Sequence, residues 1–418
     1  MTQTEDQNRG AGSVLKIPNF RALWIGQTIS QIGDGLTSLA ILIVVNQLTG
    51  STKALATVAI ALALPQLLIG LFAGVFVDRW DRRRIMIVSD ILRGFVVIGF
   101  IFIREPSQVW MFYWLAFIQA SIGTFFDPAK SALIPNIVDS PELLAANGLS
   151  QTTRVITGVI GTALAGVLIG LAHGAWLPFL LDALSFFISA IFITRIILSG
   201  QENARTEEAA NDSIDQLKEG LRFTFRHRMI GTAMIALALT MLGFGAVNVL
   251  FVPFMVNLLQ TPISWVGILE AAQVVGMVLG SSLVALLASR VKLKQLISTG
   301  IFLLGSLIML IGTLQSIWSV GITLFVVGLV LTPVQAGVST SMQRYVPNEM
   351  RGRVGAALNT VISLASVISM ALSGILGDAL GIRQVFFLSG TIAMGAGLFA
   401  ILMMKEPAPQ PVMTATSD

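Results

Sequence analysis

The clearest chemical signal in the chain is an acidic residue, Asp34, in the middle of a long apolar stretch. Gln27, Gln31 and Ser38 flank it at helical spacing, so a helix would place all four side chains on one face. An ionisable group in such surroundings is destabilising and is usually kept for function. If water reaches this polar stripe, the carboxyl can exchange protons or bind a cation. We therefore expect Asp34 to face a water-filled cavity; the alternative is a structural aspartate that hydrogen-bonds to neighbouring helices.

A second acid, Glu270, lies in another apolar stretch, with Gln273, Met277 and Ser281 on about the same helical face. Glu270 is closer to the end of its stretch than Asp34 is, so a hydrated structural role is the alternative to a functional one. We take Glu270 and Gln273 as the second candidate site for protons or substrate.

Three more charged residues fall within apolar stretches: Arg93, Arg154 and Asp182. We expect Arg93 and Arg154 to lie near the ends of their helices, with Asp90 one helical turn away as the partner of Arg93. Asp182 stands beside small residues that suit helix packing. These positions favour structural roles for all three.

Other chemistries are excluded by the residue types. The chain has no cysteine and only two histidines, His173 and His227. Disulfides, thiolate metal sites and a histidine-rich metal centre are therefore excluded. A membrane-embedded lipid enzyme would need a nucleophile with its base, or metal ligands, at membrane depth. We therefore expect no enzyme, no metal and no cofactor.

The elements that carry these residues are predicted to be membrane-spanning helices. The 418 residues are 55% hydrophobic and only 11% charged, whereas a water-soluble domain is about one quarter charged. A helix needs about 20 apolar residues to cross the hydrocarbon core of a bilayer. The stretches that qualify are 22–48, 54–77, 85–104, 109–127, 148–171, 177–198, 230–257, 264–288, 295–314, 318–341, 354–377 and 384–404.

These stretches divide the chain into two equal parts. We expect a tail at 1–21, six helices at 22–198, a linker with an amphipathic surface helix at 199–229, six helices at 230–404, and a tail at 405–418. Each part has a Pro-Asn pair between its fourth and fifth stretch, Pro135-Asn136 and Pro347-Asn348. Equivalent halves are typical of carriers that rock around a site at the membrane midplane. The sequence thus predicts an all-α membrane protein of twelve transmembrane helices in two pseudo-symmetric halves.

Orientation follows from the positive charges. Most of the 26 Lys and Arg residues fall in loops and tails on the side of the N-terminus. Cytoplasmic loops carry an excess of such residues, so both termini are predicted to be cytoplasmic, in a bacterial-type inner membrane. The basic composition therefore reflects membrane topology, and we expect no nucleic-acid partner.

The loop after the second stretch reads Gly74-Val-Phe-Val-Asp78-Arg79-Trp80-Asp81-Arg82-Arg83-Arg84. It resembles the signature loop of the major facilitator superfamily, except that Asp81 stands where the pattern has glycine. The resemblance implies a cytoplasmic gate formed by Gly74, Asp78, Arg79, Arg82 and Arg83. Asp78 would accept hydrogen bonds from the start of the eleventh span, near Gly352 and Arg353. The alternative is a cluster of arginines that only sets orientation.

Further segments resemble one branch of this superfamily, bacterial exporters related to macrolide-efflux and enterobactin-export proteins. They are NFRALWIGQTISQIGDG (19–35), FFDPAKSALIP (125–135), LLAANGLSQ (143–151) and VPNEMRGRVG (346–355). An antiporter-type motif is present as Gly161-Thr162-Ala-Leu-Ala165-Gly166, with Thr162 in place of proline.

The resemblance implies export of an amphipathic small molecule, such as a drug, macrolide or siderophore, by a monomer that uses the proton gradient through antiport. A lipid or lysophospholipid carrier of the same fold is the alternative within this class.

Overall fold

The computed structural model describes residues 11–172, 174–197, 209–288 and 291–405, and their regular elements are all helical. In the first half these are α1 (Ala11–Val14), α2 (Pro18–Thr49), α3 (Thr52–Leu68), α4 (Gly70–Arg79), α5 (Arg82–Phe100), η2 (Pro106–Gln108), α6 (Val109–Ile137), η3 (Ser140–Glu142), α7 (Leu143–Ala172) and α8 (Trp176–Thr194). They are followed by α9 (Ala209–Arg226), α10 (Arg228–Pro253), η4 (Phe254–Leu258), α11 (Ser264–Ala288), α12 (Leu293–Ile311), α13 (Ile317–Tyr345), α14 (Asn348–Leu380) and α15 (Ile382–Met403).

Ten helices of the described residues are long and apolar enough to cross a membrane. The other two predicted spans, 54–77 and 85–104, correspond to α3 with α4 and to α5. The first is broken at Ile69, just after Pro65, whose ring cannot donate a backbone hydrogen bond. The second has sufficient length but carries Asp90 and Arg93 within it. These two segments therefore differ from the ten long apolar helices because one is interrupted and the other carries charged residues.

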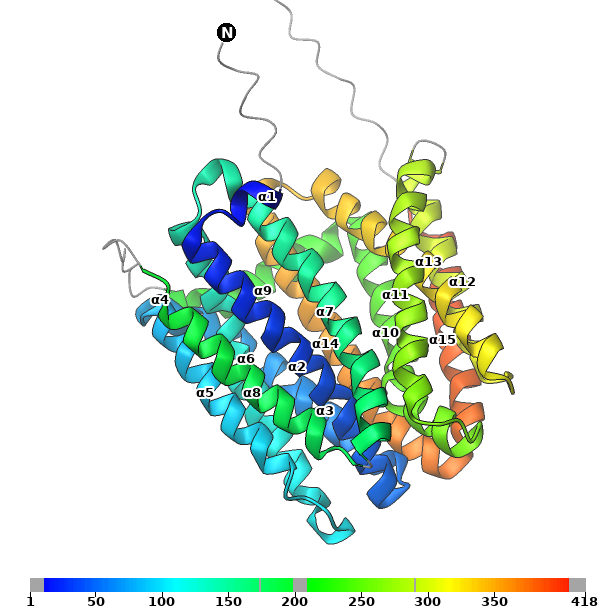
Figure 1. Ribbon diagram of the computed structural model, residues 1–418. Coiled ribbons are helices and arrows are strands. Elements are labelled where there is room, and N and C mark those ends of the chain that lie inside the picture. Colours follow the sequence, from blue (N-terminus) through cyan, green and yellow to red (C-terminus); the bar gives the residue numbers. More distant parts are fainter. Residues whose placement is uncertain (1–10, 173, 198–208, 289–290, 406–418) are drawn as a thin grey trace, which may run out of the picture.

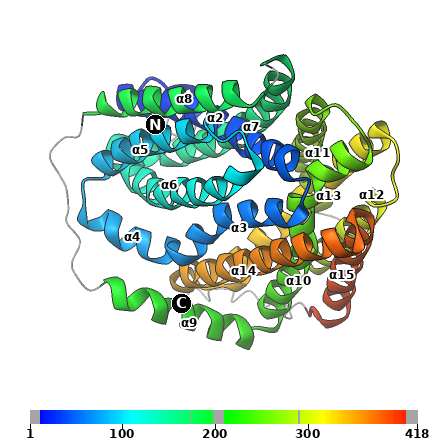
Figure 2. The ribbon, with the colours of Figure 1, turned by 90° about the horizontal axis from the view of Figure 1, so that it is seen from below.

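Helices α2 to α8 form one bundle and α10 to α15 form a second beside it (Figure 1). The bundles meet along two pairs of helices, α3 with α14 and α7 with α11, which lie next to each other when viewed along the bundle (Figure 2).

The two bundles converge at one end of the molecule and diverge at the other (Figure 1). We call the end where α2 meets α3 the closed end, and the end where α2 begins and α15 finishes the open end. At the closed end the bundles are in contact: a Cβ atom at Gly166 of α7 would lie 3.1 Å from the Ile263 carbonyl oxygen. Towards the open end, a Cβ atom at Gly148 or Gly158 of α7, or at Gly352 of α14, would meet no atom within 4 Å.

The helices extend further than the hydropathy predicts. The predicted loop at 128–147 is wrong, because α6 continues through Pro128 and Pro135 to Ile137 and α7 already begins at Leu143. Prolines occur within transmembrane helices because neighbouring helices and local changes in helix geometry satisfy the backbone groups that proline leaves without a partner. The predicted loop at 342–353 is likewise reduced, since α14 begins at Asn348.

The helix in the central linker, α9, packs against α14. A Cβ atom at Gly220 of α9 would lie 3.1 Å from the Val354 backbone nitrogen. Residues 199–208, the first part of the predicted linker, lie outside the described residues.

Candidate functional site: a central cavity

A cavity of about 1020 Å³ lies between the two bundles. Its wall is formed by residues of α2, α3, α5, α6 and α7 on one side and of α10 to α14 on the other. The structure places all five predicted proton or substrate residues on this wall: Asp34, Gln31, Gln27, Glu270 and Gln273.

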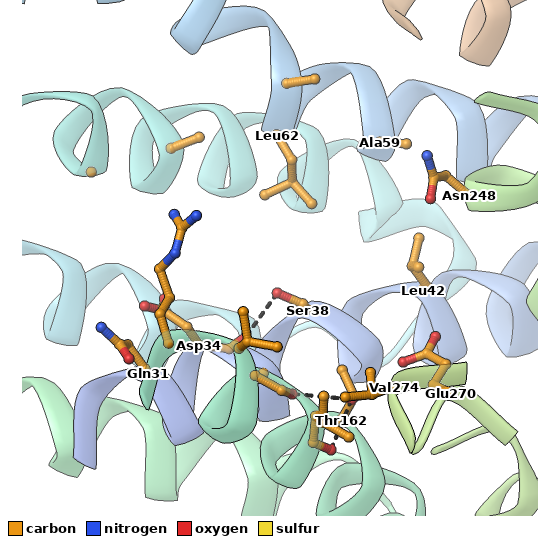
Figure 3. A pocket seen from close by; sticks show the side chains of 18 of the residues that line it. Gln31, Asp34, Ser38, Leu42, Ala59, Leu62, Thr162, Asn248, Glu270 and Val274 are labelled. Carbon is orange, nitrogen blue, oxygen red and sulfur yellow. Dashed lines mark hydrogen bonds between the residues drawn. The ribbon is translucent and has the colours of Figure 1, made fainter. Parts of the chain in front are cut away.

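Asp34 projects into the cavity because its two neighbours pack α2 tightly on its other sides (Figure 3). A Cβ atom at Gly33 would lie 3.0 Å from the Asp182 Cα of α8, and one at Gly35 would lie 2.8 Å from the Gly158 carbonyl oxygen of α7. These backbone-level approaches are possible only for residues without a side chain. The Gly-Asp-Gly sequence thus directs two faces of α2 to helix packing and leaves the carboxyl on a third face.

The Asp34 carboxylate forms an ion pair with Arg93 of α5, through Oδ1 and Nη2. The Arg93 side chain is only 14% exposed, whereas that of Asp34 is 37% exposed. The guanidinium also lies 4.1 Å from the ring centroid of Phe186, a cation–π arrangement. The predicted pairing of Arg93 with Asp90 is therefore wrong. Arg93 instead reaches from the middle of α5 to the neighbouring helix α2.

Two further acids lie behind this pair, away from the cavity. Asp90 of α5 is fully buried, with the Ser189 hydroxyl close by but outside hydrogen-bonding geometry. Asp182 of α8 is also fully buried and accepts a hydrogen bond of 3.3 Å from the Ser185 hydroxyl. Both carboxyls are close enough to interact electrostatically with Arg93. The region around one guanidinium therefore contains three carboxyl groups in the part of the chain that is described.

The two glutamines of the polar stripe connect α2 to other helices. The Gln27 amide donates to the Ser189 hydroxyl at 3.4 Å, and the Thr157 hydroxyl donates to Gln31 Oε1 at 3.0 Å. Both side chains border the cavity, but each also links α2 to α8 or α7. Gln27 and Gln31 therefore help to hold the helix that presents Asp34.

Glu270 and Gln273 are positioned by glycines of α11. A Cβ atom at Gly267 would lie 3.0 Å from the Ala163 carbonyl oxygen of α7, and one at Gly276 would lie 3.2 Å from the Gly328 Cα of α13. Helix α11 is thus packed closely against both neighbours, with Glu270 on the remaining face, beside Val274 (Figure 3).

The predicted gate arginines Arg82 and Arg83 contact backbone carbonyls of their own bundle. Arg82 Nη1 donates to the Ala132 carbonyl at 3.1 Å and Arg83 Nε to the Ile193 carbonyl at 3.1 Å, both within the first bundle. The Ile193 carbonyl belongs to the last turn of α8, where carbonyl groups lack helical partners and attract basic side chains.

Of the other gate positions, the structure describes the surroundings of Arg79, Gly352 and Arg353. Arg353 pairs with Glu219 of α9, and Gly352 borders open space, because the bundles are apart at this end. Arg79 is exposed. The side-chain environments of Gly74 and Asp78 lie outside the described part of the structure.

The contacts that join the bundles at the closed end were not predicted. Asp378, near the end of α14, accepts hydrogen bonds from the Thr52 backbone N–H at 2.9 Å, the Thr52 hydroxyl at 2.7 Å and the Ser51 hydroxyl at 3.1 Å. It therefore caps the N-terminus of α3 from the opposite bundle. Asn46 of α2 and Asn257 of η4 exchange two amide hydrogen bonds, of 3.1 and 3.2 Å.

The sequence contained part of the signal for the Asp378 contact. Ser51 at the start of an apolar stretch is an ordinary N-cap residue, and its side chain does accept from the Ala54 N–H at 3.4 Å. That an acid from the other half would approach the same turn could not be read from spacing.

The chain resembles known proteins over most of its length. A family model described as a transmembrane secretion effector, of the major facilitator type, matches residues 10–417. Macrolide efflux protein A of Streptococcus pyogenes is 29% identical over 386 residues, covering 89% of this chain and 93% of that protein. The multidrug efflux pump Tap of Mycobacterium tuberculosis strain H37Rv is 28% identical over 377 residues, covering 88% and 89%.

Solved structures share the architecture. The nucleoside transporter NupG superposes with a TM-score of 0.75 at 13% identity, over 93% of this chain and 99% of that one. A bacterial homologue of the iron transporter ferroportin, in an inward-facing state, gives a TM-score of 0.72 at 16% identity, over 94% and 100%. At these identities the likeness is one of fold.

Proposed function

We propose that this chain, which belongs to the transmembrane secretion effector family of the major facilitator superfamily, exports an amphipathic small molecule by alternating access. The observation that carries the proposal is the cavity between the bundles, shut at one end and open at the other, with the Asp34–Arg93 pair on its wall. The transported molecule would be of the drug, macrolide or siderophore type, in keeping with the efflux proteins among the relatives.

In this proposal the chain crosses the cell membrane twelve times as a monomer, with both termini in the cytoplasm. The loops at the open end contain most of the basic residues, which supports this orientation. The open end would then face the cytoplasm, and the cavity would load substrate from that side or from the inner leaflet.

Proton antiport is the proposed source of energy. Asp34 is the proposed proton site, because its carboxylate borders the cavity and pairs with Arg93, so a proton and the guanidinium compete for the same carboxylate oxygen. Asp34 borders the cavity and exchanges its proton there. Protonation of Asp34 releases Arg93 from its ion pair, so the charge of the cavity wall changes with each proton.

The Gly74–Arg84 loop would act in the other state. When the open end closes, Asp78 would approach the start of α14 near Gly352 and accept hydrogen bonds from it, charge against helix dipole. The Arg353–Glu219 pair lies where that contact would form, so α9 is placed to accompany the closure.

A transport assay with purified protein in proteoliposomes tests the proposal. A panel of radiolabelled drugs, macrolides and siderophores is offered under an imposed pH gradient, and the gradient is then collapsed with a proton–cation exchanger. Substrate accumulation that is lost when the pH gradient is collapsed supports the proposal. Substrate accumulation that is unchanged without the gradient contradicts antiport. A parallel assay of head-group-labelled lysophospholipid flux separates a lipid carrier from a drug exporter.

A further inference from the structure

Asp34 and Glu270, two of the acids that border the cavity, differ in their partners. Asp34 is neutralised by Arg93. Glu270 has no such partner, because among the described residues no lysine, arginine or histidine forms an ion pair with it. The Thr162 hydroxyl of α7 lies near its carboxyl. A partly buried carboxylate without a counter-charge is unfavourable, and it gains most from a ligand that supplies one.

The surroundings of Glu270 are apolar. Leu42 of α2 and Val274 of α11 lie beside it in the cavity, and Asn248 of α10 is the uncharged polar residue on the facing side (Figure 3). Leu42 is eight residues beyond Asp34 on α2, which corresponds to about 12 Å along the helix. Glu270 therefore lies deeper in the cavity than the Asp34–Arg93 pair, toward the closed end.

Coordination chemistry indicates which kind of cation a site at Glu270 would bind. Calcium and magnesium take six or more oxygen ligands or keep several waters. No group of three or more His, Cys, Asp or Glu residues that could hold a metal ion is found among the described residues. A single carboxylate in an apolar wall instead suits an organic cation, whose hydrocarbon surface contacts the side chains while its charge meets the carboxylate.

We infer that Glu270 is the subsite for the positively charged group of the substrate, and that the substrate class is a lipophilic organic cation. This inference rests on the proposed function, because it takes the cavity as the substrate site. Asp34, already paired, serves protons rather than the substrate charge. Glu270 lies one turn from Gly267, where α11 and α7 are in backbone contact at the closed end. A cation bound there would therefore lie directly next to the contact that must separate when the closed end opens.

Equilibrium binding of two ions of equal shape and opposite charge tests the inference. Tetraphenylphosphonium and tetraphenylborate are titrated into the purified full-length protein in detergent, and binding is followed by calorimetry. The wild-type protein is expected to prefer the phosphonium. Glu270→Gln, which keeps the side-chain shape, should weaken phosphonium binding at least about tenfold. Glu270→Lys should reverse the preference in favour of the borate.

A matched control is available in the same cavity. Asp127 also borders the cavity, but it is 67% exposed and pairs with Lys130 at 3.1 Å. Asp127→Asn removes the same charge and should change phosphonium binding less than about threefold. Size-exclusion profiles and thermal unfolding of each variant report whether it is folded.

Three results would overturn the inference: unchanged phosphonium binding in Glu270→Gln, equal losses in Glu270→Gln and Asp127→Asn, or no phosphonium binding by the wild-type protein. These measurements need no gradient and no transport. A failure of proton-driven export would therefore leave them intact, and the two proposals can fail separately.

Discussion

Asp378 is predicted to hold the closed end shut, and its replacement by alanine should open that end. Its carboxylate connects the end of α14 to the first turn of α3 through three hydrogen bonds, from Ser51 and Thr52. Alanine removes all three acceptors and leaves the start of α3 without its cap from the opposite bundle. Only the conformation with the closed end shut contains this contact, so the loss falls on that conformation alone.

The size of the effect follows from what a helix cap contributes. Replacing an acidic N-cap by alanine costs about 0.5–2 kcal/mol. Asp378 is exposed, so water replaces part of the lost bonding and a value of about 1–2 kcal/mol is expected. Since about 1.4 kcal/mol is a factor of ten, the equilibrium should shift about five- to thirtyfold toward the state with this end open. A minor state of about 1–10% would rise to between about 5% and about 75%.

Spin-label distance measurements can follow this shift, because the chain contains no cysteine that would react with the label. One cysteine pair, at Leu171 and Gln315, reports on the closed end from opposite bundles. A second pair, at Leu144 and Glu349, reports on the open end. All four positions are exposed. Asp378→Ala should lengthen the first distance and shorten the second in the same fraction of molecules.

Glu105→Ala is the control. It removes an exposed carboxylate at the same end, but one that accepts from Ser107 within its own bundle, at 3.3 Å. It should leave both distance distributions unchanged. The reasoning would be refuted if Asp378→Ala left the distributions as in the wild-type protein, or if Glu105→Ala shifted them equally.

Two further predictions concern the helices around Asp34. Gly161→Val should lower the temperature of the unfolding midpoint in detergent, because a Cβ atom there would lie 2.8 Å from the Gly35 Cα and overpacking costs about 1–3 kcal/mol. Gly158→Ala, one turn away, should leave the midpoint unchanged, because its Cβ atom would meet no atom within 4 Å. Equal effects of the two variants would contradict the packing explanation. Arg93→Gln should destabilise the protein by about 1–3 kcal/mol by leaving Asp34 without its counter-charge, and adding Asp34→Asn should recover part of that loss in a double-mutant cycle of thermal unfolding; additive losses would show that the two side chains do not act as a pair.

Much of the architecture could be predicted from the sequence, because helix length and hydropathy are imposed by the bilayer itself. Membership of the major facilitator superfamily is confirmed, as is the expectation of a transporter rather than an enzyme. Helix ends were less predictable. Pro128 and Pro135 are strong break signals in a soluble helix, but α6 passes through both because packing within the bundle outweighs local propensity.

The sequence indicated which polar residues border the cavity, but not which side chains they contact. The polar stripe of α2 identified Asp34, since an acid in an apolar stretch is conspicuous in one dimension. Arg93 is its partner because Gly33 and Gly35 fix how α2 packs against α8 and α7, and such three-dimensional proximity leaves no trace in spacing along the chain. The Asp378 contact was missed for the same reason, as it joins residues more than three hundred positions apart.

The central claim is that Asp34 carries the proton that drives export, and one comparison tests it most directly. Wild-type protein and the Asp34→Asn variant are reconstituted in proteoliposomes, and each is assayed for uptake driven by a pH gradient and for exchange of labelled against unlabelled substrate without a gradient. The account predicts that Asp34→Asn abolishes gradient-driven accumulation but retains exchange, because the cavity and its substrate contacts remain. Undiminished gradient-driven accumulation by Asp34→Asn would contradict it.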